Sequence, residues 1–178
     1  MAQVQINSGT VYWIAWFVDA AAAATGGQFS YSTTASTNQR ATITPATYPN
    51  FPSSASGLTY ATQVWSIYGV DSNSVTLLGD ANVETNTSSE GSDSVTLIKF
   101  TAVASGLLNE LLIYVNVTGG NVVGAIYSDN GGVPDLLLGD SSATPTALSS
   151  TGWVGITGVI VPPVSNIGAS LLAQLTSQ

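Results

Sequence analysis

The stretch Val11-Tyr12-Trp13-Ile14-Ala15-Trp16-Phe17-Val18 decides the fold, and it stands near the start of the sequence. Strands with one wet face alternate apolar and polar residues, whereas this stretch is apolar throughout. Its β-branched and aromatic residues are typical of strands. We therefore predict a β-strand over 11–18 whose two faces are both covered.

The rest of the chain carries very little charge. Charged residues make up 7% of the 178 residues, the only cations are Arg40 and Lys99, and the net charge is −8. Ordinary soluble domains contain about 25% charged residues. The negative balance makes nucleic acid and anionic membranes poor partners. Two interpretations remain open: a secreted β protein with a neutral, hydroxyl-rich surface, or a surface buried against neighbouring copies, where charge is depleted.

The apolar stretch at 11–18 does not resemble a targeting or membrane segment. No basic residue precedes Val11, as a signal peptide would require. The stretch is also far shorter than the ~20 residues of a spanning helix. We expect no membrane insertion, and an extracellular, cell-surface filament or virion location.

Short apolar segments punctuated by Gly, Pro, Asn and Ser predict a single all-β domain over 1–178. The strands that we expect are 4–6, 11–18, 28–33, 40–43, 63–70, 75–78, 95–102, 107–117, 121–128, 153–161 and 170–175. The alanine run at 20–24 is too short to nucleate a helix by itself, so we expect a loop or a strand extension there. The polar stretch 83–94 is expected to be an exposed loop or a linker.

A motif in the second half resembles a known module. The sequence IYSDNGG at 126–132 is followed by Pro134 and later by Trp153. These residues resemble a jelly-roll β-sandwich module of bacterial secreted and adhesion proteins and of phage fibre proteins. In that module a GT-x-YW-x-A strand comes next, but here this motif stands at 9–15. Residues 4–70 thus resemble the back half of the module and 76–170 the front half, which implies a circularly permuted sandwich with a structural or adhesive role.

The rotated order has two physical outcomes. The halves can close on each other within one chain, or the 11–18 strand can complete the sheet of an adjacent copy. A weak echo of the first strand at 164–178 favours the second outcome. We therefore expect residues 11–18 to be an assembly strand of a non-enzymatic structural subunit, which forms a homopolymeric filament or virion fibre by strand donation and apolar contacts. The alternative is a monomeric carbohydrate-binding adhesion module, which is favoured if the strand folds wholly within its own subunit and copies make little contact.

The residue types available for chemistry are few. The chain contains neither histidine nor cysteine, which excludes Ser-His-Asp triads, thiol nucleophiles and imidazole-bound metals. Carboxylate pairs are the remaining option, but Glu84 and Glu90 lie in the polar 83–94 stretch, where we do not expect a raised pKa. Glu110 is the third glutamate. We expect no enzymatic activity and no cofactor.

One loop could hold a metal ion. Asp129, Asn130 and Asp135 offer oxygen ligands of the kind that calcium prefers. The same Asp-Asn-Gly-Gly sequence is a strong turn former, because these residues tolerate positive φ. The turn is the favoured interpretation, and we expect no bound metal.

Aromatic residues suggest a sugar-stacking platform. The candidates are Trp13, Trp16, Trp65, Trp153 and Tyr48. Aromatic residues of β-sandwiches more often form the core, and we assign Trp153 to it. Tyr48 and Phe51, on a proline-rich loop, are the candidates for exposed contact with surface glycans.

Two sites fit the N-glycosylation sequon. They are Asn86-Thr87-Ser88 and Asn116-Val117-Thr118. Asn86 lies in the polar stretch that we expect to be exposed. We therefore favour Asn86 over Asn116 as an acceptor.

Overall fold

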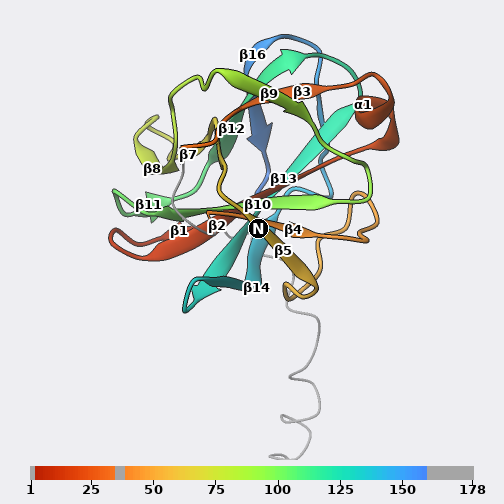
Figure 1. The fold of residues 1–178 in the computed structure, drawn as a ribbon. Helices are drawn as coiled ribbons and strands as arrows, with labels where there is room; N and C mark the ends of the chain where they lie inside the picture. Colours follow the sequence, from red (N-terminus) through yellow and green to blue (C-terminus); the bar gives the residue numbers. More distant parts are fainter. Residues whose placement is uncertain (1–2, 35–38, 160–178) are drawn as a thin grey trace, which may run out of the picture.

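The structure is a computed structural model, and it describes residues 3–34 and 39–159. Two antiparallel β-sheets pack face to face as a β-sandwich, and the first sheet curls (Figure 1). This confirms the all-β prediction. The expected strand at 170–175 and the echo at 164–178 lie outside the described residues.

The hydrogen-bonded pairs of strands define the strand order in each sheet. The first sheet runs β14 (Val133–Asp140), β13 (Asn121–Asn130), β2 (Val11–Val18), β10 (Val95–Thr101), β4 (Arg40–Ile43) and β5 (Leu58–Ala61), with β15 (Thr146–Ala147) beside β13. The second sheet runs β6 (Val64–Trp65), β3 (Gln28–Ser32), β12 (Glu110–Val117), β7 (Ile67–Val70) and β8 (Thr76–Gly79), with β16 (Gly152–Thr157) beside β12 and β9 (Asn86–Ser89) beside β3. A separate pair joins β1 (Gln5–Ile6) to β11 (Gly106–Leu107).

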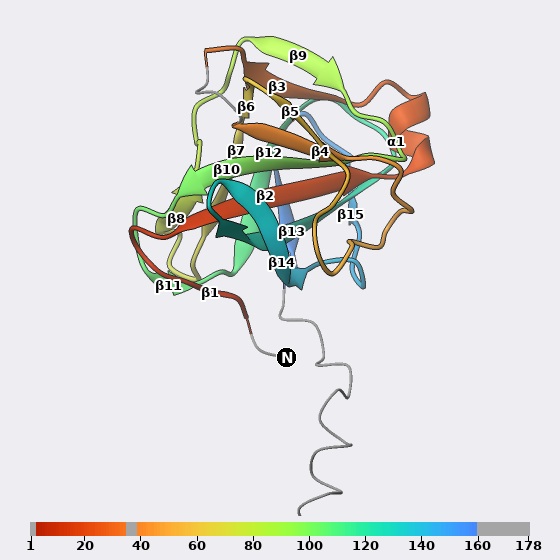
Figure 2. The ribbon, with the colours of Figure 1, turned by 60° about the horizontal axis from the view of Figure 1, so that its bottom comes forward.

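Strand β2 has the bounds that the sequence predicted, and it lies near the centre of the first sheet. It pairs antiparallel with β10 on one side and with β13 on the other, so that Ile14 lies opposite both Ile98 and Ile126. Figure 2 shows β2 between these two strands. A strand from the first part of the sequence therefore completes a sheet whose neighbouring strands come from the second part of the same chain.

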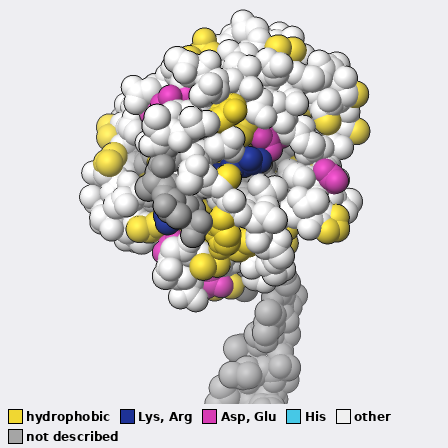
Figure 3. All heavy atoms as spheres, viewed as in Figure 1, with side chains coloured by type: hydrophobic (Ala, Val, Ile, Leu, Met, Phe, Trp, Pro, Cys, Tyr) yellow, Lys and Arg dark blue, Asp and Glu magenta, His cyan; other side chains and the backbone are white. Residues whose placement is uncertain are grey.

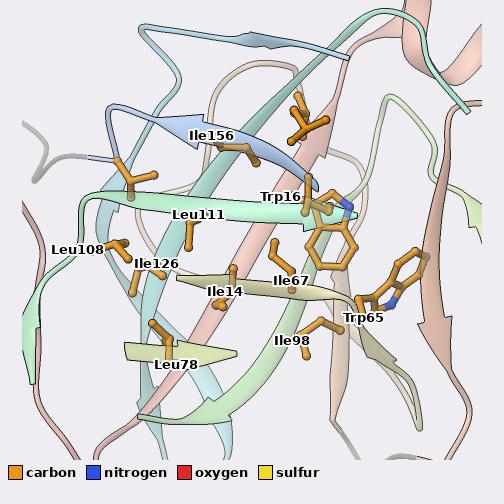
Figure 4. Packing of buried hydrophobic residues seen from close by; sticks show 14 of the residues in the cluster. Ile14, Trp16, Trp65, Ile67, Leu78, Ile98, Leu108, Leu111, Ile126 and Ile156 are labelled. Atoms are coloured by element: carbon orange, nitrogen blue, oxygen red, sulfur yellow. The ribbon is translucent and has the colours of Figure 1, made fainter. Parts of the chain in front are cut away.

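Both faces of β2 are buried, as the unbroken apolar sequence predicted. No residue from Tyr12 to Val18 is more than 5% exposed. Alternate residues point to opposite faces of a strand, so Ile14 and Trp16 enter a main core between the sheets, where Trp16 meets Trp65 at 5.1 Å between ring centroids (Figure 4). Phe17 points the other way, into a second core on the far side of the first sheet.

The loop after β4 closes the second core. Phe51 on this loop packs against Phe17, with 6.3 Å between ring centroids. The loop then runs to the opposite edge of the sheet, where Ala55 N–H donates to Asp135 C=O at 3.0 Å and Leu137 N–H donates to Ser53 C=O at 3.0 Å. These bonds tie the loop to β14, so that it joins the two edges of the curled first sheet.

The expectation of no helix at 20–24 is wrong. Helix α1 (Ala20–Ala24) forms directly after β2. Asp19 caps it, accepting a hydrogen bond from Ala22 N–H at 2.8 Å, and Ala22 is buried. The helix lies so close to Gly120 that a Cβ there would collide with the Ala22 backbone. Tertiary packing and the cap thus offset the nucleation cost that an isolated segment could not.

The polar stretch 83–94 is not a linker. Its central residues form β9, which pairs with β3 from Gln28 to Tyr31. Four strands were missed by the sequence analysis: β5, β9, β14 and β15. Strand β9 lies in the polar stretch where we expected an exposed loop or a linker, and tertiary pairing overrides this local preference.

Candidate functional site

The candidate assembly strand, Val11–Val18, is covered by its own chain. The sequence analysis favoured a neighbouring copy as the cover. The structure instead places β10 and β13 at its two edges, the second sheet over one face, and the loop after β4 over the other. The apolar character of β2 thus needs no second copy to explain it.

Tyr48 and Phe51 are not the exposed pair that the sequence analysis expected. Phe51 is 9% exposed and lies against Phe17. Tyr48 also packs edge-to-face on Phe17, at 5.4 Å between centroids. Burial, together with the negative charge of Asp19, raises the pKa of Tyr48 to about 12. Both aromatic rings therefore cover the second core, and they present little surface to a glycan.

Asp129, Asn130 and Asp135 do not converge on a metal site. The two carboxylate oxygens of Asp129 accept hydrogen bonds from Trp13 Nε1 at 2.7 Å and from Gly132 N–H at 2.9 Å. Within the described ranges, no three Asp, Glu, His or Cys side chains form a metal-binding group. The sequence instead forms a tight turn in which Gly131 and Gly132 have φ of 64° and 90°.

The two glycosylation candidates differ in accessibility. Asn86 is exposed on β9, near one edge of the second sheet. Asn116 is half-buried, and its Nδ2, the atom that would carry the sugar, donates to Ser30 Oγ at 2.7 Å. The geometry favours Asn86, as the sequence analysis did.

A buried ion pair was missed by the sequence analysis. Arg40 Nη2 lies 3.2 Å from Glu90 Oε2, which also accepts a hydrogen bond from Thr96 Oγ1 at 2.6 Å. Burial raises the pKa of Glu90, although Arg40 and Thr96 oppose the shift. The expectation of no raised pKa in the 83–94 stretch is therefore wrong. Sequence reasoning had no signal for this pair, since its partners come from β4, β10 and the segment after β9.

Trp153 does not belong to the core, contrary to our assignment. Its neighbours Val154 and Ile156 point into the main core, so Trp153 lies on the outer face of the second sheet. There it packs edge-to-face on Tyr68 of β7, at 4.9 Å between centroids, and on Tyr114 of β12, at 5.3 Å. All three side chains are half-buried. We call Tyr68, Tyr114 and Trp153 the outer aromatic cluster.

The alternation of apolar core residues and outward-facing residues along β12 could have predicted this cluster. Leu111, Ile113 and Val115 are buried in the main core. The residues between them, among them Tyr114, must then face outward. An aromatic residue at such a position, opposite Trp153 in the register, marks a surface that differs from the rest of the hydroxyl-rich exterior.

Comparison with known proteins identifies no relative. No family model, curated protein or solved structure matches the chain. None of the helical segments in the described part of the chain has the length and apolar character needed to cross a bilayer.

Proposed function

We propose that the protein is a non-enzymatic structural subunit that assembles with copies of itself into an extracellular filament or a virion fibre. The observation that carries this proposal is the composition of three edge strands. Among the described residues, strands β5, β9 and β16 each pair with a single strand, and none contains a charged residue or a proline. Natural proteins guard such edges with charge and proline, because open edges pair with other chains.

The opposite edge of the first sheet, at β14, differs from these three strands because it is protected. Strand β14 contains Pro134 and Asp135, and the loop after β4 covers its outer side. That edge is therefore protected, whereas β5, β9 and β16 lack both charge and proline. The face of the molecule in Figure 3 carries few charged side chains, and charge is depleted where protein surfaces meet.

Strand donation, which the sequence analysis favoured, is the alternative to edge pairing as the mechanism of the same assembly. A β2 strand from one copy would occupy the slot between β10 and β13 of the next, in the register that the single chain shows. Exchange of an identical element preserves every contact of the slot. The same slot supports the proposed jelly-roll permutation, because a strand of the 4–70 half lies between two strands of the 76–170 half.

Edge lysines test the assembly. Lysine on an exposed edge position blocks pairing with another sheet. We expect the wild-type chain to sediment as a polymer and to form filaments by electron microscopy. The triple variant Thr59→Lys, Thr87→Lys, Thr157→Lys, with one exposed position on each edge strand, should remain monomeric.

A matched control separates edge pairing from a general effect of charge. Ser72→Lys, Asn82→Lys and Ser150→Lys add the same charge at exposed positions outside strands, and this variant should still polymerise. A wild-type chain that stays monomeric at all concentrations would refute the proposal and leave the carbohydrate-binding adhesion module in its place. Polymers of the edge variant would refute edge pairing and favour strand donation.

A further inference from the structure

We propose that the outer aromatic cluster is a binding platform for a neutral polysaccharide, whose sugar rings pack against Tyr68, Tyr114 and Trp153. This inference goes beyond the proposed assembly and does not depend on it. The three side chains come from β7, β12 and β16, which lie side by side in the second sheet (Figure 1). Hydrogen-bonded neighbouring strands supply a rigid base for such a platform.

The cluster is not needed to complete the core. The main core is filled by other side chains, and Trp13, Trp16 and Trp65 are all fully buried. Trp153 is the one tryptophan of the four that is not fully buried. Large aromatic side chains that remain partly exposed on an outer face are typical of binding surfaces, where one end is apolar and the other is wet.

The ring geometry holds the platform in one shape. Trp153 stands nearly perpendicular to both tyrosines, at 80° to Tyr68 and 82° to Tyr114. Edge-to-face pairs of this kind stabilise each other by about 0.5–1.5 kcal/mol beyond burial. The rings are therefore ordered before a ligand arrives, which lowers the entropy cost of binding.

Polar atoms at the rim suit sugar hydroxyls. Within the described residues, Trp153 Nε1 and the hydroxyls of Tyr68 and Tyr114 make no hydrogen bond, and none of them is a buried atom. Glu110 shares this face of β12 and lies over Gly155, where a Cβ would overlap its carboxylate. Donors and an acceptor thus surround the apolar rings, which matches the mixed surface of a pyranose.

The charges select against other ligands. Glu110 is a negatively charged side chain on the face of β12 that carries Tyr114, while Arg40 and Lys99 lie on β4 and β10 of the first sheet. A negative group without a nearby cation disfavours nucleic acid and acidic glycans. A neutral polysaccharide is the ligand that satisfies both the rings and this charge.

Binding can be tested on the full chain, at a concentration where sedimentation shows single molecules. The probes are insoluble cellulose and chitin for pull-down, and soluble neutral glucans and galactomannans for affinity electrophoresis, with heparin as the anionic comparison. We expect retention by at least one neutral polysaccharide and none by heparin. Trp153→Ala should weaken that retention about tenfold, the loss of roughly one stacked ring.

Two further variants keep the test decisive. Tyr114→Ala should also weaken binding, and it removes a ring without touching β16. Tyr60→Ala removes a tyrosine that is 39% exposed on β5, and it should bind like the wild type; circular dichroism checks that each variant is folded. Failure of every neutral polysaccharide to bind, or equal binding by the wild type and folded Trp153→Ala and Tyr114→Ala variants, would overturn the proposal.

Discussion

The indole Nε1 of Trp13 donates a hydrogen bond to Asp129 Oδ1, with 2.7 Å between the two atoms. Trp13 is fully buried in β2, and Asp129 precedes the Gly131-Gly132 turn that joins β13 to β14. The bond therefore links the GT-x-YW-x-A motif near the start of the chain to the IYSDNGG motif of the second half. It gives both motifs a structural role in one sandwich.

Removing this acceptor should destabilise the fold. In Asp129→Ala the buried indole N–H of Trp13 loses its partner, which costs about 1–3 kcal/mol. Urea unfolding should show a lower midpoint with an unchanged slope. Asp135→Ala is the matched control, since its side chain makes no hydrogen bond to the described residues. Equal stability of the two variants would contradict the structural role of Asp129.

Truncation of Phe17 tests the second core. Its ring is fully buried between Tyr48 and Phe51. Phe17→Ala should lower the free energy of unfolding by about 3–5 kcal/mol, because it leaves a cavity under the loop. Tyr60→Ala, at a 39% exposed position of the same sheet, should change it by less than about 1 kcal/mol. A small effect of Phe17→Ala would mean that the loop does not close over β2.

The buried ion pair should make stability depend on pH. Burial raises the pKa of Glu90 above its ordinary value of 4.5. Between 4.5 and the raised pKa, the folded state binds more protons than the unfolded state, so the free energy of unfolding falls as pH rises through this window. In the Glu90→Gln variant the free energy of unfolding should fall less with rising pH. Denaturant titrations from pH 4 to pH 7 measure this dependence. An identical slope in the wild type and the variant would rule out Glu90 as its source.

Loss of Arg40 alone should destabilise the fold far more than loss of both Arg40 and Glu90. Arg40→Met leaves the buried Glu90 carboxylate without its counter-charge, which costs about 3 kcal/mol at neutral pH. The deficit should shrink as pH falls towards the raised pKa of Glu90, because the buried carboxylate then takes up a proton. The double variant Arg40→Met, Glu90→Met should recover most of the stability, and a double variant as unstable as Arg40→Met would contradict this explanation.

Expression in a glycosylating host distinguishes the two sequons. Asn86 is exposed, whereas Asn116 Nδ2 is engaged by Ser30. Mass spectrometry should find one glycan, lost in Asn86→Gln and retained in Asn116→Gln. A glycan at Asn116 would show that the Asn116–Ser30 bond is not formed when the sugar is added.

The sequence allowed the all-β class and the bounds of β2 and β4 to be predicted, because unbroken or alternating apolar residues report burial directly. It did not predict α1, whose stability comes from the Asp19 cap and contact with Gly120 rather than from alanine itself. Strand β9 was missed for a similar reason. Its polar sequence gives no sign of the backbone hydrogen bonds that it forms with β3.

The candidate sites were harder to predict than the strands. An exposed loop position suggested that Phe51 faces solvent, but the curl of the first sheet turns it onto Phe17. Trp153 was assigned to the core because tryptophan usually lies there, while the register with Tyr114 places it outside. Both errors arose because burial depends on pairing between distant segments, which local composition does not encode.

Cysteine trapping tests most directly whether β2 fills the sheet of its own chain. Val11 lies opposite Thr101 in the β2–β10 register, at a spacing that permits a disulfide, and the chain contains no native cysteine. The double variant Val11→Cys, Thr101→Cys is oxidised and run on a non-reducing gel. Whether or not the protein has assembled, the gel should show single chains with an internal disulfide. Mixed single variants should form no linked heterodimer. Ladders from the double variant, with heterodimers from the mixture, would show instead that β2 lies in the sheet of a neighbouring copy.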